Sequence, residues 1–180
     1  MKIYWVQTDV DNYCDLSQDL GMYDFLVAHD RRRSLSRCQP VTYSLTPPDV
    51  YIEHPKLKRG DFWSFSPFST FAMPAISVEK VKPFLEEAGE LIALPYKAER
   101  FSVLNVLKCV DCVDPETEAL GILNRSYVAD RVQHGIFRDP NGVYMFVSEF
   151  TGDPATEFKA CVEHENMTGL IFREVWSSEN

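Results

Sequence analysis

Apolar and polar residues alternate in short runs along much of this chain, a pattern typical of β-strands with one buried face. In the first 75 residues, Pro and Gly residues break the sequence into especially short pieces. The runs predict strands at residues 2–7, 41–45, 50–53, 62–66, 101–113, 133–138, 143–148 and 170–176.

A first helix is predicted from apolar residues that recur at spacings of three and four. This apolar stripe consists of Val78, Val81, Leu85 and Ala88. Ser77 is a good N-cap residue, and Gly89 stands where a C-cap is expected. Because Pro83 falls inside the pattern, we expect the helix to kink or to begin later than Ser77.

A second helix is predicted to begin with Asp153 as N-cap and Pro154 at the first helical position. Its apolar face consists of Ala155, Phe158, Cys161 and Val162. We expect this helix to end before Gly169, because glycine is common just beyond a helix terminus.

A hairpin is predicted where residues 136–138 and 143–147 flank Asp139-Pro140-Asn141-Gly142, a sequence suited to a tight turn. Together these elements predict an α+β fold with a mostly antiparallel sheet and a few helices packed on one side. We expect residues 1–75 to form a loop-rich β subregion and residues 76–180 an α+β domain, the two making one compact unit.

The charge distribution is uneven. The 180 residues contain 27 acidic and 18 basic side chains, for a net charge of -9. Residues 1–60 sum to zero, so residues 61–180 hold the whole excess. This balance argues against nucleic acid or an anionic membrane as partner, since both present phosphates. Without a signal-like N-terminus or a long apolar span, the sequence predicts a cytoplasmic protein that does not enter the membrane.

Most catalytic templates are missing from the sequence. There is no G-x-G phosphate loop, no G-x-S-x-G nucleophile elbow and no H-E-x-x-H metal motif. The four histidines are isolated from one another along the chain. We therefore assign no catalytic residue and expect a protein that is not an enzyme. A small hydrolase stays open as an alternative, and it would require His134, Asp114 and Cys109 to converge.

Five cysteines are scattered along the chain, which suits reduced thiols better than a disulfide framework. Cys109 and Cys112 form the one motif-like pair. In a strand, residues three apart point to opposite faces, so these thiols could share a metal only across a bulge or turn. We therefore expect no metal or cofactor, while a zinc or redox module on this pair stays open as an alternative.

Residues 75–176 contain motifs in a recognisable order. A helix ends in Gly89-Glu90-Leu91, an aromatic strand carries Asn105, and Asp114-Pro115 follows as an acid-Pro turn. The series closes with Gly169-Leu170-Ile171-Phe172-Arg173-Glu174-Val175-Trp176. This order resembles immunity protein family eleven of bacterial polymorphic toxin systems, formerly a domain of unknown function. The resemblance implies a bacterial protein that neutralises a cognate toxin by binding it.

The motif residues themselves have structural explanations. Gly89 ends the first helix, and Gly169 permits a turn before the last strand. Leu170, Phe172 and Trp176 are expected on one face of that strand, where they would fill the core. Glu90, Leu91 and Asn105 belong to the same motif set.

An interface with the toxin is predicted at the acidic turn that follows the longest predicted strand. Its residues are Asp111, Asp114, Glu116 and Glu118. Many toxin domains in such systems are basic nucleases, and an acidic inhibitor would be steered to a basic surface by its charge. The same four acids are also compatible with a solvated turn that has no partner.

Overall fold

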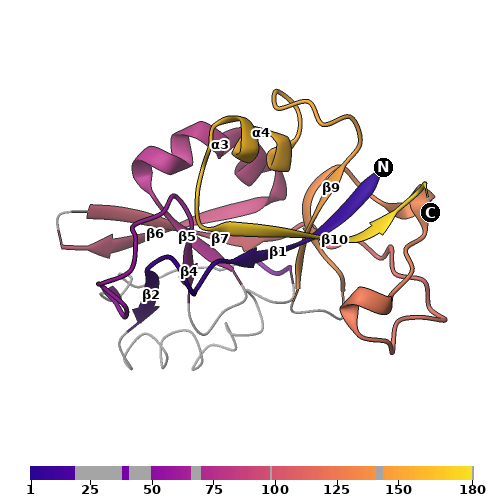
Figure 1. Ribbon diagram of the computed structural model, residues 1–180, viewed down its shortest axis with the longest axis horizontal. Helices are drawn as coiled ribbons and strands as arrows, with labels where there is room; N and C mark the ends of the chain where they lie inside the picture. The colour runs from indigo at the N-terminus through magenta and orange to yellow at the C-terminus, as the bar shows by residue number, and fades with distance from the viewer. Residues whose placement is uncertain (19–37, 41–49, 66–69, 98, 141–143, 180) are drawn as a thin grey trace.

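A computed structural model describes residues 1–18, 38–40, 50–65, 70–97, 99–140 and 144–179. Within these residues the chain forms ten strands in two sheets, two α-helices and two short 3-10 helices. The fold is α+β and mostly antiparallel, as the sequence predicts. Both α-helices lie on the same side of the sheets (Figure 1).

The smaller sheet has four strands, all antiparallel, and joins the two ends of the chain. Its order is β10 (Leu170–Ser177), β1 (Lys2–Thr8), β9 (Met145–Glu149) and β8 (Gly135–Arg138). Strand β1 lies between β9 and β10, so an N-terminal strand sits inside a sheet built otherwise from the C-terminal half. The pairing of β8 with β9 confirms the predicted hairpin, whose tip lies outside the described residues.

The larger sheet has six strands, with one parallel pair, β2 and β4. Its order is β3 (Val50–Ile52), β2 (Asp15–Gln18), β4 (Trp63–Phe65), β5 (Phe71–Pro74), β7 (Glu99–Val106) and β6 (Gly89–Tyr96). The predictions for 50–53 and 62–66 are confirmed within a residue or two, whereas β2, β5 and β6 were not predicted. The predicted strand at 41–45 lies outside the described residues.

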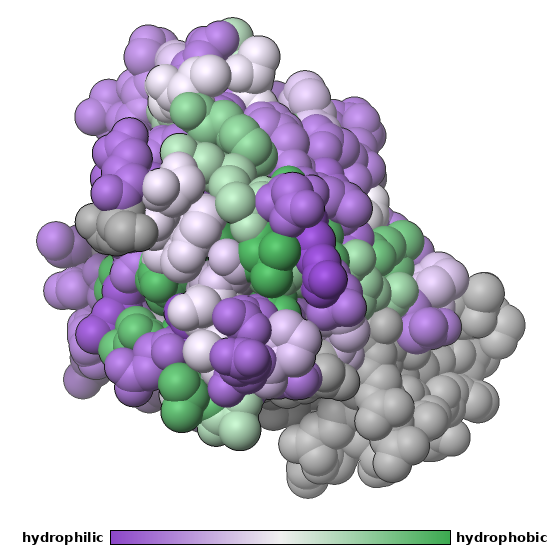
Figure 2. All heavy atoms as spheres, turned by 90° about the vertical axis from the view of Figure 1, so that its right-hand side faces the viewer, coloured by the Kyte–Doolittle hydropathy of each residue, from purple (hydrophilic) through white to green (hydrophobic). Residues whose placement is uncertain are grey.

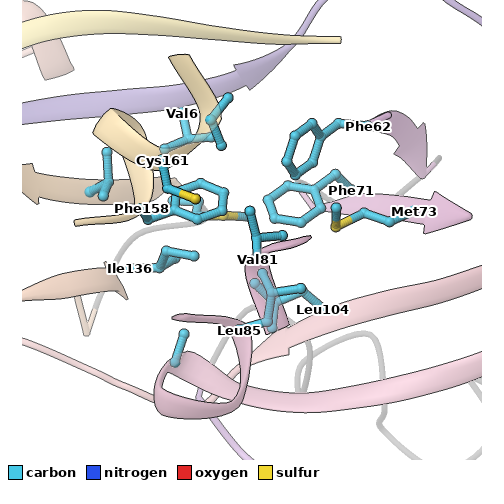
Figure 3. Close-up of a cluster of buried hydrophobic side chains, with 14 of the residues drawn as sticks. Val6, Phe62, Phe71, Met73, Val81, Leu85, Leu104, Ile136, Phe158 and Cys161 are labelled. Carbon is cyan, nitrogen blue, oxygen red and sulfur yellow. The ribbon is translucent and has the colours of Figure 1, made fainter. Parts of the chain in front are cut away.

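The main core forms where both sheets meet α3 (Ala75–Ala88) and α4 (Phe158–His164). Figure 3 shows Val81 and Leu85 of α3 and Phe158 of α4 among side chains from both sheets. Phe62, Phe71 and Phe158 pack ring against ring, with centroids 5.1 to 6.4 Å apart. Two further clusters cover the outer faces of the sheets, so each sheet is apolar on both sides.

Helix α3 buries the predicted stripe but begins earlier than predicted. Pro74 occupies the N-cap position, and the helix continues through Pro83 on its exposed side. Ser77 is therefore not a cap, and its hydroxyl donates to Asp61 at 2.8 Å. The free energy gained by burying the apolar stripe exceeds the cost of the missing helical hydrogen bond, since Pro83 has no N–H to donate. Gly89 is the C-cap, as predicted, and its N–H donates to the carbonyl of Leu85.

Helix α4 begins later than predicted, with Glu157 at the N-cap position. Asp153 instead caps a preceding turn, because its carboxylate accepts from the N–H of Ala155 at 2.9 Å. Phe158, Cys161 and Val162 are buried as predicted, and the helix ends before Gly169.

The last strand contains an irregularity that the sequence pattern does not reveal. Tyr4 pairs with Glu174 but Ile3 pairs with Trp176, so Val175 is an extra residue on β10. The bulge turns Trp176 to the face opposite Leu170 and Phe172. Those two residues pack against the main core and Trp176 against the cluster on the outer face, so the prediction of one shared face is wrong.

Candidate functional site

The connection between β7 and β8, residues 107–134, carries all four acids predicted to bind a partner. The predicted strand 101–113 is too long, because β7 ends at Val106. Beyond it the backbone is held by the end of β8: the N–H of Val110 donates to the carbonyl of Arg138 at 2.8 Å. The apolar residues of this stretch resemble a strand in sequence because Val110, Cys112 and Val113 are buried in a cluster.

The loop closes again at an antiparallel bridge between Val113 and Tyr127. The N–H of Asp114 donates to the carbonyl of Ser126 at 2.9 Å, and the N–H of Val128 donates to Cys112 at 2.8 Å. Residues 114–126 therefore form a loop with a fixed neck. Tyr127 is buried beside Phe146 and Trp176, and this burial raises the pKa of its phenol.

Residues 109–120, called here the acidic segment, contain four acids and no base. Asp111, Glu116 and Glu118 are exposed. Asp114 is half-buried and organises the turn, since its side chain accepts from the N–H of Glu116 at 3.0 Å and its carbonyl from the N–H of Thr117 at 2.9 Å. Three of the four predicted residues are thus exposed at the surface, and Asp114 has a structural role.

A buried ion pair lies behind the acidic segment. Arg125 donates to one carboxylate oxygen of Asp139 at 2.9 Å, and the two side chains are 15% and 5% exposed. The other oxygen of Asp139 is buried with no hydrogen-bond partner. Burial raises the pKa of Asp139, although Arg125 acts in the opposite direction. The neighbouring Arg138 is also buried, which lowers its pKa to about 10.

The sequence does not predict this pair, because its members are distant along the chain. The turn motif accounts for Asp139 as the first residue of the hairpin turn, and no predicted motif includes Arg125. Arg125 and Asp139 are 14 residues apart and meet only through the pairing of loop and sheet. No local spacing indicates such a contact.

A hollow of about 220 Å³ opens between the acidic segment and the end of β8. It is lined by Asp111, Val113, Pro115, Glu118, Asp139 and Pro140. Two of the predicted residues, Asp111 and Glu118, line it, whereas Asp114 and Glu116 do not. Figure 2 views the molecule from the side on which the two chain ends lie in Figure 1, and hydrophilic residues there surround smaller apolar areas.

Two larger hollows lie elsewhere. One, of about 350 Å³, lies between the sheets beside Trp5, Phe71 and Tyr144. The other, of about 530 Å³, is an open depression beside the N-terminus, Glu149 and His164. None of the four acids of the predicted interface lines either hollow.

The two thiols of the Cys109–Cys112 motif have different surroundings. Cys109 is exposed, whereas Cys112 is buried in the outer cluster, which raises its pKa to about 12. Cys109 instead neighbours Cys38, whose pKa is raised to about 12 by burial and by the Cys109 thiol. Among the described residues, no group of three or more His, Cys, Asp or Glu side chains is arranged to hold a metal ion.

The three residues required by the hydrolase alternative have separate surroundings. His134 lies 4.0 Å from Glu157 and against the ring of Phe150. Asp114 organises its own turn. Cys109 forms a bridge with Arg138 at the last residue of β8, whereas His134 precedes the first residue of that strand. These contacts give no support to a shared catalytic centre.

The remaining motif residues have structural roles. Asn105 is fully buried, and its amide donates to the carboxylate of Glu90 at 2.8 Å and to the carbonyl of Gln39 at 2.9 Å. Leu91 pairs with Leu104 and packs against the main core. Gly89 lies so close to the backbone of Asn105 that a Cβ would overlap its carbonyl oxygen.

No α-helix among the described residues is long and apolar enough to cross a lipid bilayer. Comparison with known proteins found no match: no family model fits this sequence, and no curated protein or solved structure is significantly similar to it.

Proposed function

We propose that this chain is a non-catalytic immunity protein that binds a cognate bacterial toxin in the cytoplasm and occludes the toxin's active surface. The order of motifs in residues 75–176 supports this proposal through its resemblance to immunity protein family eleven. The acidic character of residues 61–180 supports a basic partner, such as a nuclease whose surface normally receives phosphates.

The observation that carries the proposal is the presentation of Asp111, Glu116 and Glu118 on an anchored stretch of backbone. Asp111 lies between Val110, which the end of β8 holds, and Val113, which the bridge to Tyr127 holds. The same bridge closes the loop 114–126, which carries Glu116 and Glu118. A surface that is ordered before binding loses less conformational entropy when the complex forms. The negative charge of these exposed carboxylates also favours rapid, electrostatically steered association with a basic partner.

Occlusion requires only complementary surfaces, so the protein needs no reacting group. A toxin whose substrate is nucleic acid presents Lys and Arg around its active site. Carboxylates placed over those side chains would occupy the positions of substrate phosphates. The buried ion pair of Arg125 and Asp139 supports the loop from behind, which favours a fixed surface over a flexible tail.

The experiment is co-expression with the toxin encoded by the neighbouring gene. The chain should rescue cells from that toxin and not from an unrelated one, and the two proteins should co-purify. The triple variant D111N/E116Q/E118Q should slow association by roughly tenfold or more at low salt, because steered association depends on these charges.

The matched control is the triple variant E79Q/E86Q/E165Q, which removes three exposed carboxylates outside the acidic segment. It changes the net charge equally and should associate nearly as fast as the parent protein. Absence of rescue, together with absence of a complex, would contradict the proposed function. Equal slowing by both triple variants would show that total charge acts and not this segment.

A further inference from the structure

The hollow beside the acidic segment combines two kinds of lining. Its exposed edge carries the carboxylates of Asp111 and Glu118, and its inner wall includes Asp139, which is 4% exposed. Val113, Pro115 and Pro140 supply apolar contacts between them. A ligand that fits this lining has a cationic end and an aliphatic body.

Asp139 provides an observation independent of the acidic edge. Arg125 reaches only one of its carboxylate oxygens, through one guanidinium nitrogen, and the second oxygen has no donor. A buried carboxylate oxygen without a donor is costly, because its lost hydration is not replaced. Because Asp139 lines the hollow, its negative charge attracts a cation that enters it.

Arginine suits this environment better than the other cations that proteins offer. Its guanidinium presents several N–H donors in one plane, which lets it contact two carboxylates at once. Its three methylene groups pack on apolar walls while its charged end meets acids. A bare metal ion would gain nothing from the side chains of Val113, Pro115 and Pro140.

We propose that this hollow is a receptor for one arginine side chain of the partner protein, with Asp139 inside and Asp111 and Glu118 at the edge. That the arginine belongs to a basic toxin rests on the proposed function, whereas the preference for arginine rests on the lining of the hollow. Such an arginine would be a specific contact within the charged interface, in keeping with the frequent role of buried Arg as an interface hot spot.

The test uses N-acetyl-arginine methylamide as probe, followed by NMR on the full chain. The amide signals of Asp111, Glu118 and Asp139 should shift together on titration. N-acetyl-citrulline methylamide, a neutral analogue of similar shape, should produce no comparable shift. Equal shifts with citrulline, or arginine-induced shifts confined to other regions, would overturn the proposal.

Variants within the acidic segment make the test specific. D111N/E118Q should weaken binding of the arginine probe by about fivefold or more, since two of the three lining charges are lost. E116Q removes the same kind of charge from the same segment outside the hollow and should change the affinity less than twofold. Both variants leave the pair of Arg125 and Asp139 in place, so loss of folding does not confuse the outcome. Equal weakening by E116Q and D111N/E118Q would overturn the assignment.

The two proposals fail separately. If the neighbouring toxin is neither bound nor neutralised while the arginine probe still binds the hollow, the immunity function is wrong and the receptor chemistry stands. If the toxin is neutralised while the probe fails to bind, the hollow is not the arginine receptor.

Discussion

The side chains of Arg125 and Asp139 lie 2.9 Å apart although 14 residues separate them along the chain, and their ion pair joins the loop 114–126 to the residue that follows β8. Arg125 also donates to the carbonyl of Leu120 at 3.2 Å, so one guanidinium holds the loop at two points. The geometry of the acidic segment therefore depends on a charge that lies behind it.

Arg125→Met retains most of the aliphatic volume but leaves Asp139 buried without its cation. We expect the free energy of unfolding to fall by about 3 kcal/mol at pH 7, as is typical when one member of a buried pair is removed. Urea titration measures the change. The double variant R125M/D139N should lose less than the sum of the single variants, because both remove the same interaction.

Arg59 offers a matched comparison. It forms an exposed ion pair with Glu99, at 3.0 Å, with side chains 55% and 42% exposed. Arg59→Met should lower the free energy of unfolding by less than about 1 kcal/mol, since exposed pairs are solvated. Equal losses at Arg59 and Arg125 would contradict a special role for the buried pair.

Gly169 has a φ of +101°, and a Cβ there would overlap the carbonyl oxygen of Phe62. Gly169→Ala therefore combines backbone strain with a steric clash against the main core, and we expect a loss of at least about 2 kcal/mol. Gly121 has a φ of -61° and open space around it, so Gly121→Ala should be nearly neutral. Thermal unfolding of the two variants decides between a required glycine and a tolerated one.

Local periodicity was enough to predict the buried stripe of α3, because Val78, Val81 and Leu85 face the core at helical spacing. The same logic failed at residues 107–113, where buried residues lie in a loop and look like a strand in sequence. It also failed at Trp176, since one bulged residue reverses the face of all that follow. The acidic residues can be recognised in the sequence itself. The hollow beside them cannot, because one of its lining residues, Asp139, is brought next to the segment only by tertiary contacts.

Glu157 is a buried carboxylate that accepts from the N–H groups of Phe150, Thr151 and Gly152 at 2.6 to 2.9 Å. Burial alone would raise its pKa, but these donors, with His134 nearby, lower it below the usual value of 4.5. A carboxyl group with a lowered pKa in the folded protein stabilises the fold at pH values above its unfolded pKa. That contribution disappears as the pH falls through the folded pKa.

Glu157→Gln should therefore destabilise the protein by about 1–3 kcal/mol at pH 7, because three hydrogen bonds to a charge become weaker. The difference from the parent protein should shrink as the pH falls below about 4.5. Urea unfolding at several pH values measures it. Glu79→Gln, at an exposed position on α3, should show little difference at any pH. A difference for Glu157→Gln that is constant from pH 7 to pH 3 would contradict this assignment.

The cysteines should differ sharply in reactivity. Cys109 is exposed, while Cys14, Cys112 and Cys161 are buried and burial raises the pKa of all three thiols. A thiol-specific reagent at pH 8 should label Cys109 rapidly in the folded protein and Cys112 only after denaturation. Peptide mapping by mass spectrometry identifies the sites, and C109S should remove the rapid phase. Equal labelling of Cys109 and Cys112 would contradict the difference in burial between the two thiols.

Asp114 and Glu116 lie two residues apart in the acidic segment but have different roles. Asp114→Ala removes the acceptor for the N–H of Glu116, so we expect a loss of about 1 kcal/mol in stability. Glu116→Gln removes an exposed charge and should leave the free energy of unfolding unchanged within about 0.5 kcal/mol.

The rate of association with the toxin should show another pattern: Glu116→Gln slows it at low salt, and the effect fades as salt screens the charge. Stopped-flow association at two salt concentrations, beside urea unfolding, separates the residue that shapes the segment from the one that presents its charge. If Asp114→Ala left stability unchanged while slowing association more than Glu116→Gln, Asp114 would be a contact residue and not the organiser of the turn.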